Sequence, residues 1–123
     1  SIGEWSESDF DKNSKAVLEY EIGDSVDQNG GWYQIVTDFV DSANHTDILY
    51  IEAIDESGNT VAKAENIPGN VSIWERWKEF PILLPKRESE RIFIRVSLSR
   101  PDNNSNMERR TCSGKLSIRK GVQ

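Results

Sequence analysis

The residues best suited to chemistry in this sequence are aromatic: the chain has four tryptophans, at positions 5, 32, 74 and 77. Trp74 and Trp77 stand in the stretch WERWKEFPILLP, among alternating charges. A flat aromatic ring covers the C–H face of a sugar, while neighbouring polar side chains bond its hydroxyls. In an extended strand Trp74 and Trp77 point to opposite faces, because successive side chains alternate. We therefore expect one of them to anchor a core and the other to lie outside it.

Catalytic and cofactor-binding motifs are missing from the sequence. It contains no G-x-S-x-G turn, no H-E-x-x-H, no phosphate-binding loop and no dinucleotide fingerprint. The single histidine, His45, lies in the polar stretch SANHTD, so a catalytic triad has no second imidazole. Acidic neighbours such as Asp9 and Asp11 are expected in a chain with 21 acidic residues, where they solvate a surface. We therefore predict that the protein is not an enzyme.

Metal ligands are sparse. The single cysteine, Cys112, excludes an intrachain disulfide and a cysteine-built zinc site. Hard oxygen ligands for calcium are offered by Glu7 with residues 9–11, and by Glu21 with Asp24 and Asp27. Neither set has the spacing of a D-x-D-x-D-G loop. The sequence thus predicts no cofactor and leaves a structural calcium ion open.

The charge balance excludes one class of partner. The net charge of −6 is opposite to what a nucleic-acid duplex attracts, so no nucleic-acid partner is expected. Most of the 15 basic residues lie from Lys86 onward, and the first 60 residues are acidic. This asymmetry either pairs complementary charges on facing strands or builds a basic patch for an anionic ligand.

Two further features bear on location. No apolar run approaches 18 residues, so no membrane insertion is expected. The chain opens on SIGEW without an initiator methionine, from which we expect a piece of a larger exported protein. The prediction is an extracellular or periplasmic bacterial domain, with further domains of a parent chain beside it.

Period-two alternation dominates the chain and predicts an all-β fold. Seven strands are expected, at 15–23, 31–40, 46–54, 60–65, 78–84, 91–100 and 114–121. An eighth is added if residues 1–10 contribute one. The 123 residues fit a single domain spanning 1–123, an antiparallel β-sandwich. Because the Cys…Trp…Cys spacing of immunoglobulin domains is missing, a jelly roll of seven to eight strands is favoured over an immunoglobulin-like sandwich.

Particular strands carry more detailed predictions. The continuous apolar run at 46–54 predicts a central strand covered on both faces. Pro81 has no amide hydrogen, so its strand is expected at a sheet edge or a bulge. In the strand at 91–100, Ile94 points inward and Arg95 outward, at mid-strand where packing requires no charge.

The later part of the chain resembles the closing strands of galactose-binding-like jelly-roll domains, of which carbohydrate-binding modules are the largest group. The resemblance rests on Trp77, Phe80 and Pro81–Leu84, then RIFIRVSLS, a loop and SGKLSIRKG, and it spans residues 31–121. It implies a non-catalytic, secreted module that binds an oligo- or polysaccharide. Those modules often have an Asp near the last strand that helps bind calcium, where this chain has Cys112-Ser113-Gly114.

The predicted carbohydrate-binding residues combine aromatic and polar side chains: Trp32, Tyr50, Glu52, Trp74, Arg76, Trp77 and Arg95. The tryptophans supply stacking surfaces, and the other four bond hydroxyls or pair with acidic sugars. The alternative is a structural or protein-interaction sandwich, such as an extracytoplasmic sensor or spacer domain. In that case the tryptophans lie in an interface or in the core.

Overall fold

We describe a computed structural model of the chain. It describes residues 2–5, 15–41, 48–67, 76–89, 91–99 and 112–121. Within these ranges, residues 5, 15–16, 39–41, 48–49, 76, 98–99 and 112–113 are described by their backbone alone.

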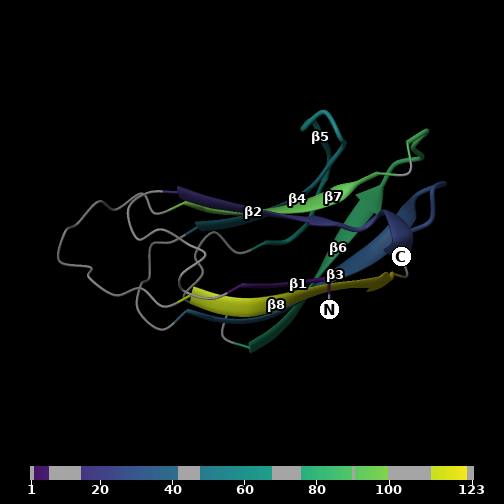
Figure 1. The fold of residues 1–123 in the computed structure, drawn as a ribbon. Coiled ribbons are helices and arrows are strands. Elements are labelled where there is room, and N and C mark those ends of the chain that lie inside the picture. The colour runs from purple at the N-terminus through teal and green to yellow at the C-terminus, as the bar shows by residue number, and fades with distance from the viewer. Residues whose placement is uncertain are drawn as a thin grey trace.

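The described residues form eight strands and one short 3-10 helix. The strands are Gly3–Trp5 (β1), Lys15–Glu21 (β2), Gly31–Asp41 (β3), Ile48–Ile54 (β4), Thr60–Lys63 (β5), Arg76–Leu84 (β6), Phe93–Ser99 (β7) and Cys112–Lys120 (β8). The helix, η2, spans Gly23–Ser25. Two layers are evident in Figure 1: sheet I, ordered β1-β8-β3-β6, and sheet II, ordered β2-β7-β4-β5. The predicted antiparallel β-sandwich is confirmed.

The strand pairs are nested. β1 pairs with β8, β2 with β7, β3 with β6 and β4 with β5, all antiparallel. Folding one long hairpin and wrapping it around a core would give this nesting, so the pairing is compatible with the predicted jelly roll. An immunoglobulin-like sandwich would place its first two strands in one sheet. In this chain β1 and β2 lie in different sheets.

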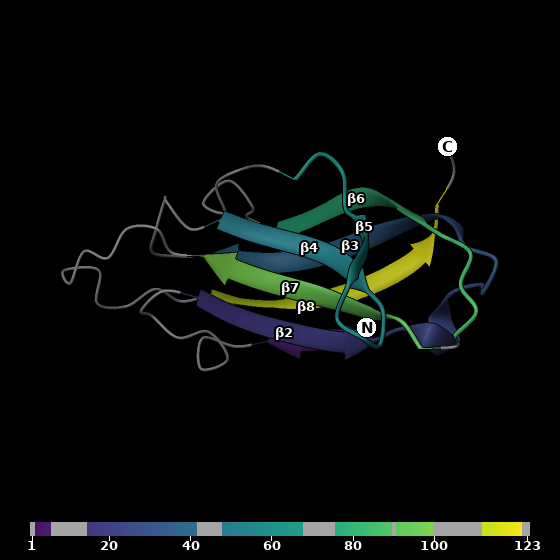
Figure 2. The same ribbon diagram turned by 90° about the horizontal axis from the view of Figure 1, so that it is seen from above.

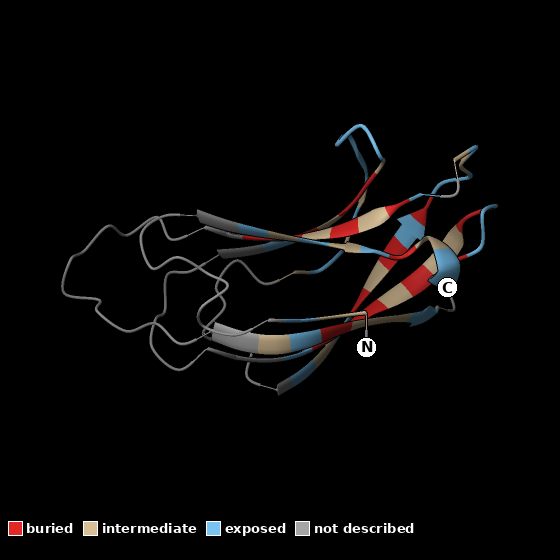
Figure 3. Cartoon of the chain, in the orientation of Figure 1, coloured by how far each residue is buried: buried red, intermediate tan, exposed pale blue. Residues whose placement is uncertain are grey.

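The core lies between the layers and follows the predicted alternation (Figure 3). Ile35 and Ile82 of sheet I and Ile51 and Ile94 of sheet II are almost completely buried. Among the residues that the structure describes, thirteen buried ones form one cluster, with further partly buried side chains packed against it. Burying such side chains is the main stabilising term of a domain this size.

The position of Pro81 agrees with its chemistry. β6 is an edge strand of sheet I, and the Pro81 carbonyl accepts a hydrogen bond of 2.8 Å from the Glu65 amide. The amide and carbonyl of a strand residue point the same way, so the Pro81 nitrogen, which carries no hydrogen, lies on the side of β6 that faces away from β3. The chain after β5 covers that side of the edge.

The prediction that residues 46–54 are covered on both faces is wrong. Tyr50 is half exposed on the outer face of β4, beside Glu52. The end of the apolar run has another cause: the register with β5 shifts between Ala53 and Ile54, and both of these side chains are buried. A bulge turns consecutive residues towards one side, which breaks the alternation without a second covered face.

Candidate functional site

The outer face of sheet II brings residues from four strands into register. Glu19, Arg95, Glu52 and Lys63 are successive pairing partners across β2, β7, β4 and β5. Figure 2 shows β2, β7 and β4 side by side in this layer, in front of sheet I. The four residues alternate in charge along one row, and neighbouring strands in the row are about 4.8 Å apart. The next row of partners is Val17, Ser97 and Tyr50.

An Arg–Glu pair lies in the middle of this face. Arg95 Nη2 is 2.7 Å from Glu52 Oε2, and Arg95 Nε donates to the same oxygen at 3.1 Å. Nη2 also donates to Thr60 Oγ1 at 3.2 Å. The two charged side chains are only 25% and 19% exposed, so water screens the pair less than it screens a surface ion pair.

A hollow of about 360 Å³ opens over this pair. We call it the Tyr50 hollow; its lining residues are Val17, Tyr50, Glu52, Arg95 and Ser97. Tyr50 is 50% exposed and Val17 46% exposed, so an aromatic ring and an aliphatic group flank the polar pair. The β4–β5 hairpin rises from the same face at one end of the sheet (Figure 1). The arrangement offers one apolar ring, one donor group and one acceptor group to a small polar ligand.

The structure does not bring the seven predicted site residues together. Tyr50, Glu52 and Arg95 line one hollow, but Trp32 and Trp77 lie on sheet I, on the opposite side of the sandwich. Arg76 begins β6 and is described by its backbone alone, and Trp74 lies outside the described residues.

Trp32 and Trp77 are also far from each other. Trp32 pairs with Leu83, whereas Trp77 pairs with Asp38, six residues further along β3. At about 3.3 Å per residue, this separates them by roughly 20 Å. Neither therefore extends the surface of the other.

Trp77 has a polar setting of its own. Its ring is 59% exposed, and its Nε1 donates to Glu79 Oε1 at 3.4 Å. Arg119 Nη2 of β8 bonds the same carboxylate oxygen. The outer face of sheet I thus also carries an aromatic ring beside an Arg–Glu pair, but this pair is 56% and 36% exposed. The expectation that one tryptophan of WERW is available outside agrees with the position of Trp77.

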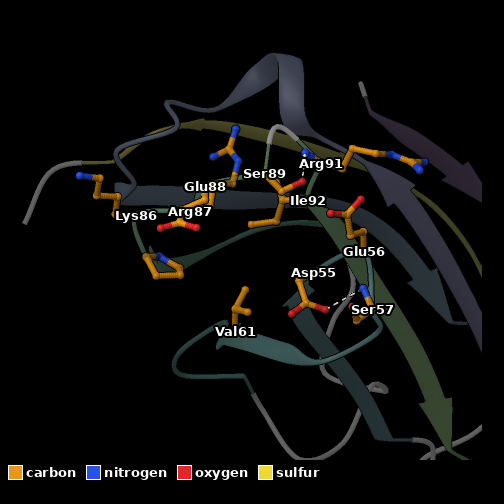
Figure 4. Close-up of a pocket in the computed structure, with 11 residues that line it drawn as sticks. Asp55, Glu56, Ser57, Val61, Lys86, Arg87, Glu88, Ser89, Arg91 and Ile92 are labelled. Carbon is orange, nitrogen blue, oxygen red and sulfur yellow. Dashed lines mark hydrogen bonds between the residues drawn. The ribbon is translucent and has the colours of Figure 1, made fainter.

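A second hollow, of about 330 Å³, lies between the β4–β5 turn and the β6–β7 connection (Figure 4). Several of its polar groups bond within the fold. Asp55 Oδ1 accepts the amides of Ser57 and Asn59, and Arg91 pairs with Glu21. We therefore interpret this region as a structural end of the sandwich.

Arg87 joins the two connections that meet at this end. Its guanidinium donates to the carbonyls of Gly23, Val26 and Asp27, and its amide donates to Gln28. It thereby fixes the η2 segment against the chain that follows β6.

The charge asymmetry of the sequence is expressed as cross-strand pairs. Glu4, Glu21, Glu52 and Glu79 each pair with a basic residue that follows position 86. The hydrogen bond with Glu21, and then the attraction of its charge, raise the pKa of Arg91 above its ordinary value. These pairs favour complementary charges over a basic patch as the interpretation of the asymmetry.

Two other findings concern metals and membranes. No group of three or more histidine, cysteine or acidic side chains in the described ranges is placed to hold a metal ion. Of the predicted calcium ligands, Glu21 bonds Arg91 and Asp27 Oδ1 accepts the Asn29 amide, whereas residues 7–11 lie outside the described ranges. In the part of the chain that the structure covers, no helix has the length and apolar character needed to cross a bilayer.

Comparison with protein-family models, with curated proteins and with solved structures found no match. The galactose-binding-like resemblance therefore stays a prediction, and the candidate site rests on its own geometry. Val17, Thr60 and Ser97 were not among the predicted site residues. No sequence signal marks them: Val17 and Ser97 reach the hollow, and Thr60 reaches Arg95, through strand register alone.

Proposed function

We propose that this domain is a non-catalytic carbohydrate-binding module whose site is the Tyr50 hollow. The observation that carries the proposal is a half-exposed tyrosine ring beside a partly buried Arg–Glu pair, in a hollow on an otherwise open sheet. The ring matches the C–H face of a sugar, and the pair matches its hydroxyls. The volume of the hollow suits one or two sugar units rather than a long buried chain.

A shallow site of this kind binds weakly. One ring and one polar pair support dissociation constants from millimolar to micromolar, or about −4 to −8 kcal/mol. Useful affinity then comes from several domains engaging one polymer, so that linkage raises the effective concentration. An oligo- or polysaccharide partner and an extracellular or periplasmic setting are part of the proposal.

The test is a glycan-array screen of the domain and of two single variants, Tyr50→Ala and Trp77→Ala. Both side chains are half exposed or more, so both variants should fold, and they lie on opposite faces of the sandwich. We expect glycan binding by the wild-type domain, loss of binding in Tyr50→Ala and retained binding in Trp77→Ala. Binding lost only in Trp77→Ala would move the site to sheet I.

A second candidate function, a protein-interaction sandwich, is favoured by one observation. Trp77 and Leu83 are 59% and 50% exposed on edge strand β6, and both point away from the core. Exposed apolar groups on an edge strand favour contact with another protein. A silent glycan array, together with self-association that Trp77→Ala abolishes in sedimentation velocity, would favour this function over sugar binding.

A further inference from the structure

The charge state of the Tyr50 hollow bears on the class of sugar that it accepts; this inference rests on the proposed function. The guanidinium of Arg95 is compensated within the protein, because Glu52 Oε2 lies 2.7 Å from Nη2 and 3.1 Å from Nε. Glu19 is the pairing partner of Arg95 on its other side. Arg95 therefore lies between two acidic residues of the row, one on β2 and one on β4.

An anionic ligand gains little from Arg95, because Glu52 already compensates the charge of the guanidinium. To take over that charge, a ligand carboxylate has to displace Glu52 or lie close to it; Lys63 lies beyond Glu52 in the same row. Displacement leaves Glu52, whose side chain is 19% exposed, without its cation. An unpaired, partly buried charge is costly, and like charges at this distance repel. The net charge of −6 adds a weaker repulsion.

The same pair retains unused hydrogen-bonding groups for a neutral ligand. The hydrogen bonds of Arg95 with Glu52 and Thr60 use Nε, Nη2 and Oε2. Arg95 Nη1 and Glu52 Oε1 make no hydrogen bond with another described residue. Nη1 is a donor and Oε1 is an acceptor. Sugar hydroxyls complement both, since a hydroxyl can accept from Nη1 and another can donate to Oε1.

We infer that the Tyr50 hollow selects neutral sugars and rejects uronates and other anionic sugars. Of the two ligand classes that the sequence left open for Arg95, hydroxyls and acidic sugars, this geometry favours the first. Tyr50 stacks on the sugar ring, and the Arg95–Glu52 pair reads the hydroxyls.

The experiment first asks whether the strongest ligand on the glycan array is neutral or anionic. Titration calorimetry then compares neutral gluco-, galacto- and manno-tetrasaccharides with their uronate counterparts, which differ only in a carboxylate at C6. For the wild-type domain we expect a neutral array ligand, and at least tenfold tighter binding of the neutral member of any pair that binds.

Two variants test the role of Glu52. Glu52→Gln frees the Arg95 charge, so we expect the preference for the neutral member to shrink at least tenfold. Glu56→Gln is the matched control: it removes the same charge from an exposed residue of the β4–β5 turn, outside the Tyr50 hollow, and should leave the preference unchanged. The wild-type comparison decides the inference even if Glu52→Gln does not fold.

The outcomes separate this inference from the function on which it rests. An anionic array ligand, or equal or tighter binding of the uronates by the wild-type domain, would overturn the neutral-sugar inference and leave the carbohydrate-binding proposal standing. An array without any bound glycan would overturn both.

Discussion

A double-mutant cycle measures how much the interaction between Arg95 and Glu52 contributes to the stability of the fold. The variants are Arg95→Met, Glu52→Met and the double variant, because methionine keeps much of the length of both side chains without charge. Fully buried pairs lose about 3–5 kcal/mol when one partner is removed, and exposed pairs are worth about 0–1 kcal/mol. At 25% and 19% exposure this pair falls between these limits.

We expect each single variant to lose about 1.5 kcal/mol in the free energy of unfolding, since it leaves one charge without its partner. The double variant should lose only about 1 kcal/mol, because no unpaired charge remains. The coupling energy between the two sites is then about 2 kcal/mol. Urea unfolding followed by tryptophan fluorescence measures all four stabilities, and glycan binding should be lost in all three variants.

The result that would refute this reasoning is a double variant that loses about 3 kcal/mol, the sum of the two singles. The coupling energy would then be zero, so each side chain would stabilise sheet II through contacts other than the ion pair. Loss of binding without much loss of stability in the double variant would instead assign the pair to recognition.

Four other predictions concern particular positions of the fold. Arg87→Met should lower the free energy of unfolding by about 2–4 kcal/mol, because it removes three charge-assisted hydrogen bonds to loop carbonyls. The control Arg91→Met removes only an exposed ion pair and should cost clearly less stability. Equal losses for the two variants in urea unfolding would contradict the role of Arg87. Gly30→Ala should lower the free energy of unfolding by about 2 kcal/mol or more, measured in the same way. Gly30 has a φ of +77°, and an added Cβ would lie 2.3 Å from the Leu84 carbonyl oxygen. Unchanged stability would mean that the turn after η2 relaxes to make room for the methyl group. Thr37→Val should raise the melting temperature and increase the free energy of unfolding by about 1 kcal/mol, because the buried Thr37 Oγ1 has no hydrogen-bond partner within the described residues. A lower stability of the variant would instead mean that this hydroxyl makes a hydrogen bond. Acrylamide should quench the fluorescence of the wild-type domain more strongly than that of Trp77→Phe, because Trp77 is 59% exposed; identical quenching would place this ring in a contact.

The sequence predicted the sandwich because strand alternation is a local property. The side chains at 92, 94 and 96 could be assigned to the core, and Arg95 to the outer face, from period two alone. The edge position of β6 followed from the missing amide of Pro81. Such features depend on a residue and its immediate neighbours, so no knowledge of the other sheet was needed.

The candidate site was only partly predictable, because it depends on which strands become neighbours. Glu52 and Arg95 are 43 residues apart, and only the order β7-β4 places them together. Trp32 and Tyr50 were both predicted to bind the same carbohydrate, yet β3 and β4 belong to different sheets. The apolar run before residue 55 led to a wrong prediction for two reasons: Tyr50 is an aromatic residue on the exposed face, and a bulge turns the consecutive residues Ala53 and Ile54 to the core side.

The two outer faces of the sandwich carry the same kind of group, an exposed aromatic ring beside an Arg–Glu pair, and burial distinguishes them. The Glu79–Arg119 pair beside Trp77 is 56% and 36% exposed on the arginine and glutamate, whereas the Arg95–Glu52 pair beside Tyr50 is 25% and 19% exposed. An exposed pair samples many geometries and exchanges its hydrogen bonds with water, so it offers a ligand little that water does not. A less exposed pair, held by Thr60 and by strands on both sides, keeps its free donor and acceptor in fixed positions. Binding to fixed groups loses less conformational entropy. Tryptophan has the larger ring, but the preorganised polar pair makes the Tyr50 face the better candidate site.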